Sequence, residues 1–194
     1  MNHLKIFPTT IGYQMARELA SEMLPVAKSL LANEDNLTNT WNYRTTYGRD
    51  LSGNVSVQKF NQRVIEYADE YLASMGFDNH SMRQGMLVDT FFSDMTAGDK
   101  HGVHAHPESQ LSGVMYLSTP PNSSRLRLYD PRPYTSFQQW PVKEETVTNW
   151  RYYDVAPEPG LLLIWPSWLS HEVMTNLSEE GRITAVFNIG YRRL

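Results

Sequence analysis

Three closely spaced histidines are the residues best suited to chemistry in this chain. His101, His104 and His106 lie within six consecutive positions, and the 194 residues contain six histidines in all. If the backbone is extended there, the side chains of His104 and His106 point to the same side. Two neutral imidazoles on one side are able to share an ion of iron, zinc, copper or nickel. The pattern predicts a metal site, with solvated loop histidines as the alternative.

A further imidazole, His171, follows in WPSWLSHEV, just after the apolar run 161–165. Pro107 interrupts regular strand pairing, so we expect His104 and His106 at a strand end or in a loop. Both histidine groups therefore flank segments rich in strand-forming residues. A closed β structure is able to bring them together.

Arg182 opens a strand whose two faces differ in chemistry. Arg182, Thr184 and Asn188 share one face around a single valine, whereas the odd-numbered residues 183–189 on the other face are wholly apolar. The apolar face must be buried. A guanidinium near a hydroxyl suits a carboxylate ligand, because its fork matches the two oxygens. The polar face is expected either to line a cavity or, as in many antiparallel sheets, to meet solvent.

A similar alternation of side-chain types occurs after the first histidines, in residues 111–118. The even positions carry Ser112, Val114, Tyr116 and Ser118, and the odd positions are apolar or glycine. This alternation predicts a strand with one buried face. From the residues alone, Tyr116 is interpreted as a core tyrosine.

The elements that position these residues change in character at residue 86. Apolar residues recur at helical spacing in 12–32, where Pro25 is expected to kink or split the helix, and in 54–77, where Gly76 signals the end. From residue 86 onward, short segments rich in β-branched and aromatic residues alternate with turn signals, as in an all-β sandwich or barrel. We expect one domain over 1–194, in which residues 1–85 are helical and residues 86–194 form a β core.

Composition narrows the function classes. The net charge is −4 and the sequence pI is about 5.8, and no basic stripe is present, so nucleic acid is not an expected partner. The absence of cysteine excludes disulfides, zinc–thiolate sites and cysteine nucleophiles,. The N-terminus lacks a signal-peptide pattern, and the longest apolar run is too short for a membrane span. A soluble, cytoplasmic protein without membrane contact is expected.

Four ordered blocks carry a family resemblance. HAHPESQLSGVMYL, LYDPR, PGLLLIWPSWLSHEV and RITAVFN resemble the 2-oxoglutarate/Fe(II)-dependent oxygenases of bacteria and phages. The match extends over residues 101–190. The resemblance implies a mainly β fold, a double-stranded β-helix or jelly roll, with the N-terminal helices packed outside.

The resemblance also implies a metal-ligand set. His104 and His171 match the histidine ligands. The wider superfamily has a carboxylate where this chain has His106, so the third ligand is either His106 or a carboxylate such as Asp130 or Glu108. Three neutral imidazoles would leave the full double charge on the iron, whereas a carboxylate would cancel one unit.

The remaining site residues follow from the same resemblance. Arg182 is implied to bind the distal carboxylate of 2-oxoglutarate, with Thr184 as its helper. Tyr116 and Asn188 match further family positions in the cavity and are expected to take part in binding the co-substrate. The segment FFSD at 91–94 departs from the W-x-N of relatives, which implies a different substrate or partner.

The implied activity is that of a non-haem dioxygenase using Fe(II), 2-oxoglutarate and dioxygen. It would hydroxylate an unidentified small molecule or peptide and release succinate and carbon dioxide. The segment 122–140 is a candidate rim for this substrate, and a homodimer is a possible assembly. Two alternatives remain open: a three-histidine metal dioxygenase that does not use 2-oxoglutarate, and a non-catalytic jelly-roll binding protein.

Overall fold

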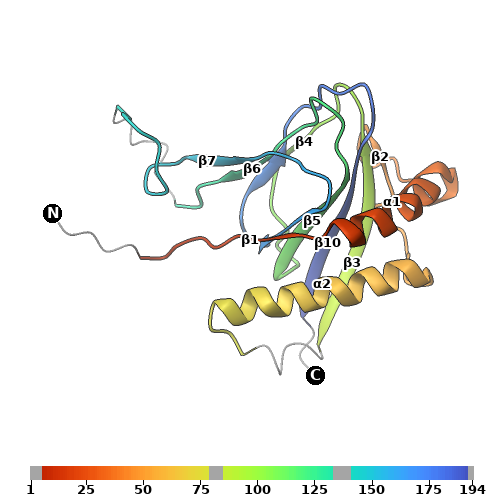
Figure 1. Cartoon of the computed structure of the whole chain (residues 1–194), viewed down its shortest axis with the longest axis horizontal. Coiled ribbons are helices and arrows are strands. Elements are labelled where there is room, and N and C mark those ends of the chain that lie inside the picture. Colours follow the sequence, from red (N-terminus) through yellow and green to blue (C-terminus); the bar gives the residue numbers. More distant parts are fainter. Residues whose placement is uncertain (1–5, 79–84, 133–140, 192–194) are drawn as a thin grey trace.

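The β-rich half of the chain forms two antiparallel sheets that pack against each other (Figure 1). The computed structural model describes residues 6–78, 85–132 and 141–191. The six-stranded sheet has the order β1-β8-β5-β10-β3-β2, and the four-stranded sheet has the order β4-β9-β6-β7. This is the jelly-roll arrangement that the resemblance implied.

The first three strands belong to the six-stranded sheet, and from β3 onward the chain alternates between the two sheets except at β6 and β7, which are neighbours in the four-stranded sheet. Their bounds are β1 Gly12–Met15, β2 Arg44–Thr45, β3 Met86–Met95, β4 His101–His104, β5 Leu111–Ser118, β6 Leu126–Tyr129, β7 Tyr152–Val155, β8 Leu161–Pro166, β9 His171–Val173 and β10 Arg182–Tyr191. The β segments expected after residue 86 are therefore confirmed. Of the candidate rim, residues 126–129 form β6, and residues 133–140 lie outside the described residues.

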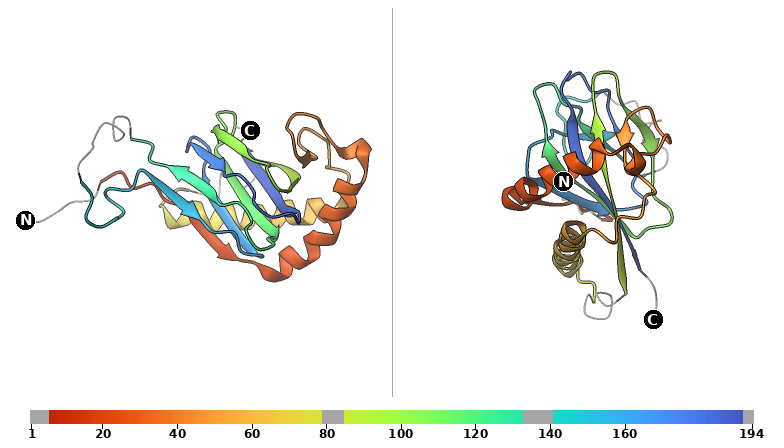
Figure 2. Two further views of the ribbon diagram at one scale, coloured as in Figure 1. Left: turned by 90° about the horizontal axis from the view of Figure 1, so that it is seen from above. Right: turned by 90° about the vertical axis from the view of Figure 1, so that its right-hand side faces the viewer.

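Two helices, α1 (Arg17–Ala32) and α2 (Val55–Ser74), cover the outer face of the six-stranded sheet (Figure 2). A short 3₁₀ helix, Glu34–Asn36, follows α1. Asn54 caps α2 by accepting hydrogen bonds from the backbone of Ser56 and Val57,. Gly76 follows α2 with φ +80°, a conformation that favours glycine, so the predicted stop is confirmed,.

The predicted start of the first helix is wrong. Residues 12–15 form β1, whose register pairs Gly12 with Ile164 and Met15 with Leu161 of β8. The local pattern is compatible with a helix, but hydrogen bonding to a distant sheet edge decides the conformation. The predicted split at Pro25 does not occur either, because α1 continues through that residue.

The two faces of β10 separate the core from the candidate site. Ile183, Ala185, Phe187 and Ile189 are buried in the core between the sheet and the helices, as predicted for the apolar face. The even-numbered residues face the four-stranded sheet, where Tyr116, Trp165, Leu126 and Leu128 form a second cluster. The polar face of β10 therefore lies inside the fold and not on its surface.

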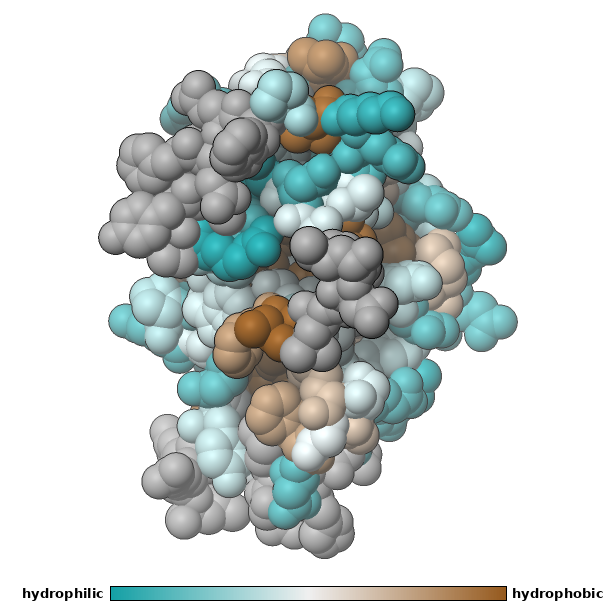
Figure 3. Space-filling view, turned by 90° about the vertical axis from the view of Figure 1, so that its left-hand side faces the viewer, coloured by the Kyte–Doolittle hydropathy of each residue, from teal (hydrophilic) through white to brown (hydrophobic). Residues whose placement is uncertain are grey.

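Several large apolar side chains reach the surface, among them Phe7, Tyr13 and Trp168. The face shown in Figure 3 is mainly hydrophilic, and its apolar side chains lie in small separate groups. Within residues 6–78, 85–132 and 141–191, no helix has the length and apolar character needed to cross a membrane.

Candidate metal and co-substrate site

The pairing of β4 with β9 brings two of the predicted histidines together. His104 and His171 are direct partners in the ladder, and their ring centroids lie 4.2 Å apart. His106 follows β4 and is held by a hydrogen bond from its backbone N–H to the carbonyl of Ser167. One ligand atom from each of the three imidazoles lies within 4.8 Å of the others.

Backbone carbonyls orient two of these rings. Nδ1 of His104 lies 2.7 Å from the carbonyl of Gly102, and Nδ1 of His171 lies 2.8 Å from that of Leu169. A carbonyl only accepts, so Nδ1 carries the proton in both rings and Nε2 keeps its lone pair. The chain thus prepares both Nε2 atoms as donors to a metal.

Burial keeps the three imidazoles neutral. It lowers the pKa of His171 to about 3 and the pKa of His106 to about 4, and it also lowers the pKa of His104,. Neutral imidazole is the form that binds metal ions. Nε2 of His106 lies 3.3 Å from Nε2 of His171, close to the ~3 Å expected between two donors about 2.1 Å from one ion at a right angle. The three side chains therefore fit Fe(II).

The carboxylates considered as substitute ligands are placed differently. Asp130 accepts hydrogen bonds from the guanidinium of Arg132, which lowers the pKa of Asp130. Glu108 is exposed and lines a pocket beside His106. Among the described residues, neither carboxylate belongs to the group whose ligand atoms converge. The assignment of His104, His106 and His171 as ligands stays a prediction.

Arg182 lies buried on the facing sheet, with only 2% of its surface exposed. The ion pairs among the described residues do not include it, and its Nε has no hydrogen-bond partner. Its contacts include Met95 Sδ at 4.0 Å and the Tyr116 ring, whose centroid lies 5.0 Å away. Burial lowers the pKa of Arg182. A buried cation without an acid partner is costly unless a ligand supplies the anion.

Two more buried donors lie on the inner face of the six-stranded sheet. Tyr116 lies beside the guanidinium, whereas Trp165 of β8 lies in the ladder row of Ser112 and Asn188. Tyr116 is fully buried, and its hydroxyl interacts with the Arg182 guanidinium but has no other partner. The indole Nε1 of Trp165 is buried without a partner. Thr184 is 1% exposed and pairs with Tyr116 in the ladder between β10 and β5. A dicarboxylate such as 2-oxoglutarate fits this set, because it offers acceptors to donors that are otherwise orphaned.

Contacts link the guanidinium end to the histidines on two sides. Trp165 packs edge-on against His171, with ring centroids 5.0 Å apart, and shares its apolar cluster with Tyr116. On the other side, the hydroxyl of Tyr43 lies 2.6 Å from Nδ1 of His101, whose ring is 4.1 Å from that of His104. The positive charge of Arg182 acts on the pKa of Tyr43, although burial dominates and raises it. Side-chain contacts therefore connect the candidate metal site with the surroundings of Arg182.

Tyr43, His101 and Trp165 were not assigned roles from the sequence. Trp165 had a signal, since alternation over 161–165 places it on one face with Leu163, toward the second sheet,. Tyr43 lies in the loop before β2, and its approach to His101 joins residues 58 positions apart. No local pattern predicts such a contact.

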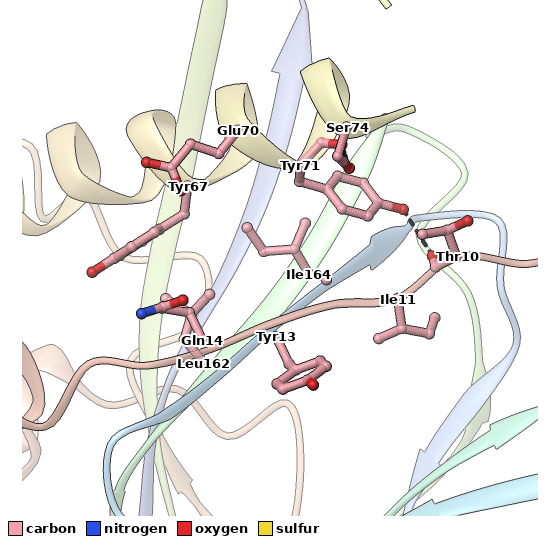
Figure 4. A pocket seen from close by; sticks show the side chains of 11 residues that line it. Thr10, Ile11, Tyr13, Gln14, Tyr67, Glu70, Tyr71, Ser74, Leu162 and Ile164 are labelled. Carbon is pink, nitrogen blue, oxygen red and sulfur yellow. Dashed lines mark hydrogen bonds between the residues drawn. The ribbon is translucent and has the colours of Figure 1, made fainter. Parts of the chain in front are cut away.

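Asn188 lies six residues from Arg182 on β10. It lines a pocket that Arg182 does not line. This pocket has a volume of about 640 Å³ and also contains His106 and Glu108. A smaller hollow of about 300 Å³ lies between β1, β8 and α2 (Figure 4). Figure 4 shows Tyr13, Tyr67 and Tyr71 around it, and none of the candidate site residues lines it.

Comparison with known proteins agrees with the fold. A family model described as "Putative 2OG-Fe(II) oxygenase" matches residues 91–188, just over half of the chain. A search of curated proteins finds no match.

Solved structures share the fold at low sequence identity. A Pseudomonas putida prolyl-4-hydroxylase is 15% identical, with a TM-score of 0.67 over 95% of this chain and 94% of that one. The non-haem α-ketoglutarate-dependent epimerase SnoN from nogalamycin biosynthesis is 15% identical, with a TM-score of 0.65 over 95% and 79%. HygX from Streptomyces hygroscopicus, solved with nickel and 2-oxoglutarate bound, is 13% identical, with a TM-score of 0.63 over 94% and 83%.

The matched segment begins in β3 and ends in β10, so it contains all three converging histidines and Arg182. On this match and this fold, the chain belongs to the family of 2-oxoglutarate- and Fe(II)-dependent oxygenases.

Proposed function

We propose that this oxygenase is a dioxygenase in which His104, His106 and His171 bind Fe(II). Arg182 binds the distal carboxylate of 2-oxoglutarate, assisted by Thr184 and Tyr116. The reaction hydroxylates a small molecule or peptide in the cytoplasm. The observation that carries this proposal is the fully enclosed guanidinium of Arg182, which has no acid partner of its own.

The residues of the chain perform three tasks in this proposal. Gly102 and Leu169 orient the histidine rings through their carbonyls, so that Nε2 of each ring faces the ion,. Arg182 fixes the far end of the oxoacid with charge-assisted hydrogen bonds. Trp165 and Tyr116 enclose the same region and exclude water from it. Bound Fe(II) supplies the oxygen chemistry that couples loss of carbon dioxide from 2-oxoglutarate to hydroxylation.

A three-histidine dioxygenase that does not use an oxoacid is the main rival. It shares the histidines but has no need of a buried cation. Arg182 separates the two, because a buried guanidinium is retained at a cost only where an anion meets it.

The test is calorimetric titration of the manganese-loaded protein with 2-oxoglutarate. Replacing Arg182 with Leu should weaken binding by roughly 2–5 kcal/mol, the scale for truncating a buried hydrogen-bonded charge pair. This corresponds to about thirtyfold or more in affinity. Arg182→Lys should recover only a fraction of the loss, since an ammonium does not reproduce a two-pronged contact. The exposed Arg125 gives the control variant Arg125→Leu, whose affinity should equal that of the wild type.

Turnover provides a second measurement. With Fe(II) and oxygen, the wild type should form succinate slowly from 2-oxoglutarate, and His171→Ala should form none. The proposal would be overturned if the wild type did not bind 2-oxoglutarate, or if both proteins formed equal amounts of succinate. Either result would favour the three-histidine dioxygenase or a non-catalytic jelly-roll binding protein.

A further inference from the structure

The pocket of about 640 Å³ beside His106 is separate from the guanidinium end of the cavity. It lies between β3, β10 and the segment that follows β4. Arg182 does not line it. Six residues of β10 separate Arg182 from Asn188, a span of roughly 20 Å at about 3.3 Å per residue. The pocket thus reaches a candidate metal ligand from the side away from the oxoacid anchor, where a second substrate would approach.

One largely buried side chain in this pocket, Asn188, keeps a donor that opens onto the pocket. Asn188 is only 9% exposed, and its Oδ1 accepts a hydrogen bond from Ser112 at 2.8 Å. Its Nδ2 donates to no group among the described residues, although the side chain lines the pocket. The amide N–H of such a side chain is available to an acceptor on a ligand.

Two carboxylates share the pocket with Asn188. Asp89 is the direct ladder partner of Asn188, so both side chains lie on the inner face of the sheet. Glu108 contributes from the segment after His106. The ion pairs among the described residues include neither carboxylate. Both are therefore available to an incoming cation.

The pKa of Asp89 shows the effect of partial burial without a cationic neighbour. Partial burial raises the pKa of Asp89, and no neighbouring positive charge lowers it. Asp154 shows the opposite behaviour, because the Arg127 guanidinium lowers its pKa. A carboxylate that is partly desolvated and unpaired gains from a bound cation.

An aromatic ring completes the pocket. Tyr47 lines it and keeps 36% of its surface exposed. Its ring packs against Trp41 at 4.5 Å and Phe91 at 5.0 Å between centroids, which holds it in place. A fixed aromatic ring near carboxylates favours organic cations, which interact with its face and spread apolar methylenes over it.

We propose that this pocket binds the prime substrate, and that the substrate is a basic amino acid, free or within a peptide. Its ammonium or guanidinium group meets Asp89 and Glu108, and its carbonyl oxygen accepts a hydrogen bond from Asn188. This assignment rests on the proposed function of the same site. In the reaction, one oxygen atom of O₂ converts a C–H bond of the substrate to C–OH, and the other enters succinate as 2-oxoglutarate loses CO₂.

The test uses calorimetry on protein loaded with manganese and 2-oxoglutarate. The probes are lysine, arginine, N-acetyl-lysine N-methylamide, and the corresponding norleucine and glutamate amides. A cationic probe should bind at least about tenfold more tightly than the neutral or acidic one, and its affinity should fall as salt rises. Preference for the blocked lysine over the free amino acids identifies a peptide as the source, and the reverse preference identifies a free amino acid.

Variants connect the binding to the named side chains. Asp89→Asn and Glu108→Gln should each weaken the cationic probe by about fivefold, the upper range for an exposed ion pair. Asn188→Ala should weaken blocked lysine but leave the weaker binding of n-butylamine, which has no carbonyl. Glu22→Gln, an exposed change on α1, is the matched control and should match the wild type.

The outcomes separate this inference from the proposed function. Equal affinity for the lysine and norleucine amides, or wild-type affinity in the Asp89 and Glu108 variants, would overturn the basic-substrate assignment even if 2-oxoglutarate binds normally. Failure of the wild type to bind 2-oxoglutarate would instead contradict the proposed function. Circular dichroism of each variant checks that it folds.

Discussion

The buried histidines hold protons far less readily than free imidazole. The pKa of His101 and of His106 falls to about 4, and that of His171 to about 3, each mainly through burial. The folded pKa values lie below the unfolded value, so between about pH 6.5 and 4 the unfolded chain binds more protons than the folded one. Acid therefore favours unfolding over this window.

We predict that the metal-free protein has a steady melting temperature above about pH 7 and loses stability as the pH falls from about 6.5 to 4. Urea unfolding at several pH values measures the slope. His101→Phe should reduce this slope by about one proton, or about 1.4 kcal/mol per pH unit. An unchanged slope in that variant would show that His101 titrates normally in the folded state.

His106 gives a prediction about which side chains bind the metal. His106→Ala should weaken Mn(II) binding by about tenfold or more, since even outer-shell partners of metal ligands contribute 10–100-fold. His106→Asp should still bind, because it restores the two-histidine, one-carboxylate set of the superfamily. Titration with Mn(II) followed by electron paramagnetic resonance measures both affinities. Wild-type affinity in His106→Ala would remove His106 from the ligand set.

At the residue scale, the spacing of the histidines alone left a metal site undecided, and the family resemblance was needed to predict that His171 joins the H-x-H pair. The H-x-H pair and the distant His171 converge as strand-end residues should, because β4 and β9 are ladder partners. The roles of Asn188 and Arg182 were grouped together, yet six strand residues separate their surroundings. Alternation predicts which face a residue lies on, but position along that face depends on the opposing sheet.

Among the elements, β5 is packed at Gly113 so closely that no side chain fits there. A Cβ at Gly113 would lie 2.2 Å from Cζ of Phe187 and 2.5 Å from the carbonyl oxygen of Leu163. The backbone of a central strand has little freedom to move away. β5 lies between β8 and β10, so this close approach sets the packing of three strands.

We predict that Gly113→Ala destabilises the protein by about 3 kcal/mol or more, at or above the usual range for overpacking. Chemical denaturation measures the change in unfolding free energy. Gly53→Ala is the control, because a Cβ there meets nothing within 4 Å and its φ is not positive. A loss below about 1 kcal/mol in Gly113→Ala would mean that the strands yield more readily than their packing indicates.

Element prediction succeeded where periodicity was internal to the segment. The alternation in 182–191 and the helical spacing in 55–74 both act locally, and both elements form as expected. Residues 12–15 failed because their conformation depends on β8, about 150 residues away along the chain. Long-range pairing of this kind leaves no signature in the shorter partner.

For the whole molecule, the buried charge of Arg182 opposes stability in the absence of ligand. Replacing a buried, unpaired charge with an apolar side chain of similar length removes its desolvation cost. We predict that ligand-free Arg182→Met melts at least about 2 °C above the ligand-free wild type.

Co-substrate should reverse this order. A ligand at 100 times its dissociation constant adds about 2.7 kcal/mol to the protein that binds it, so 2-oxoglutarate should raise the melting temperature of the wild type clearly and that of the variant, which binds it more weakly, much less. Differential scanning fluorimetry with manganese, with and without 2-oxoglutarate, measures both. A lower melting temperature for the ligand-free variant would show that the guanidinium stabilises the apo fold.

The converging histidines come from the four-stranded sheet and the segment next to it, whereas Arg182 comes from the six-stranded sheet. A co-substrate held by the metal at one end and by Arg182 at the other would therefore cross-link the two sheets. Its departure as succinate, one carbon shorter, would then alter a bridge between layers as well as empty a site. Hydrogen exchange of backbone amides in β9 and β10 would slow together when 2-oxoglutarate binds and become faster together when the product leaves. Each turnover would therefore include a brief period in which the two sheets are less firmly held together.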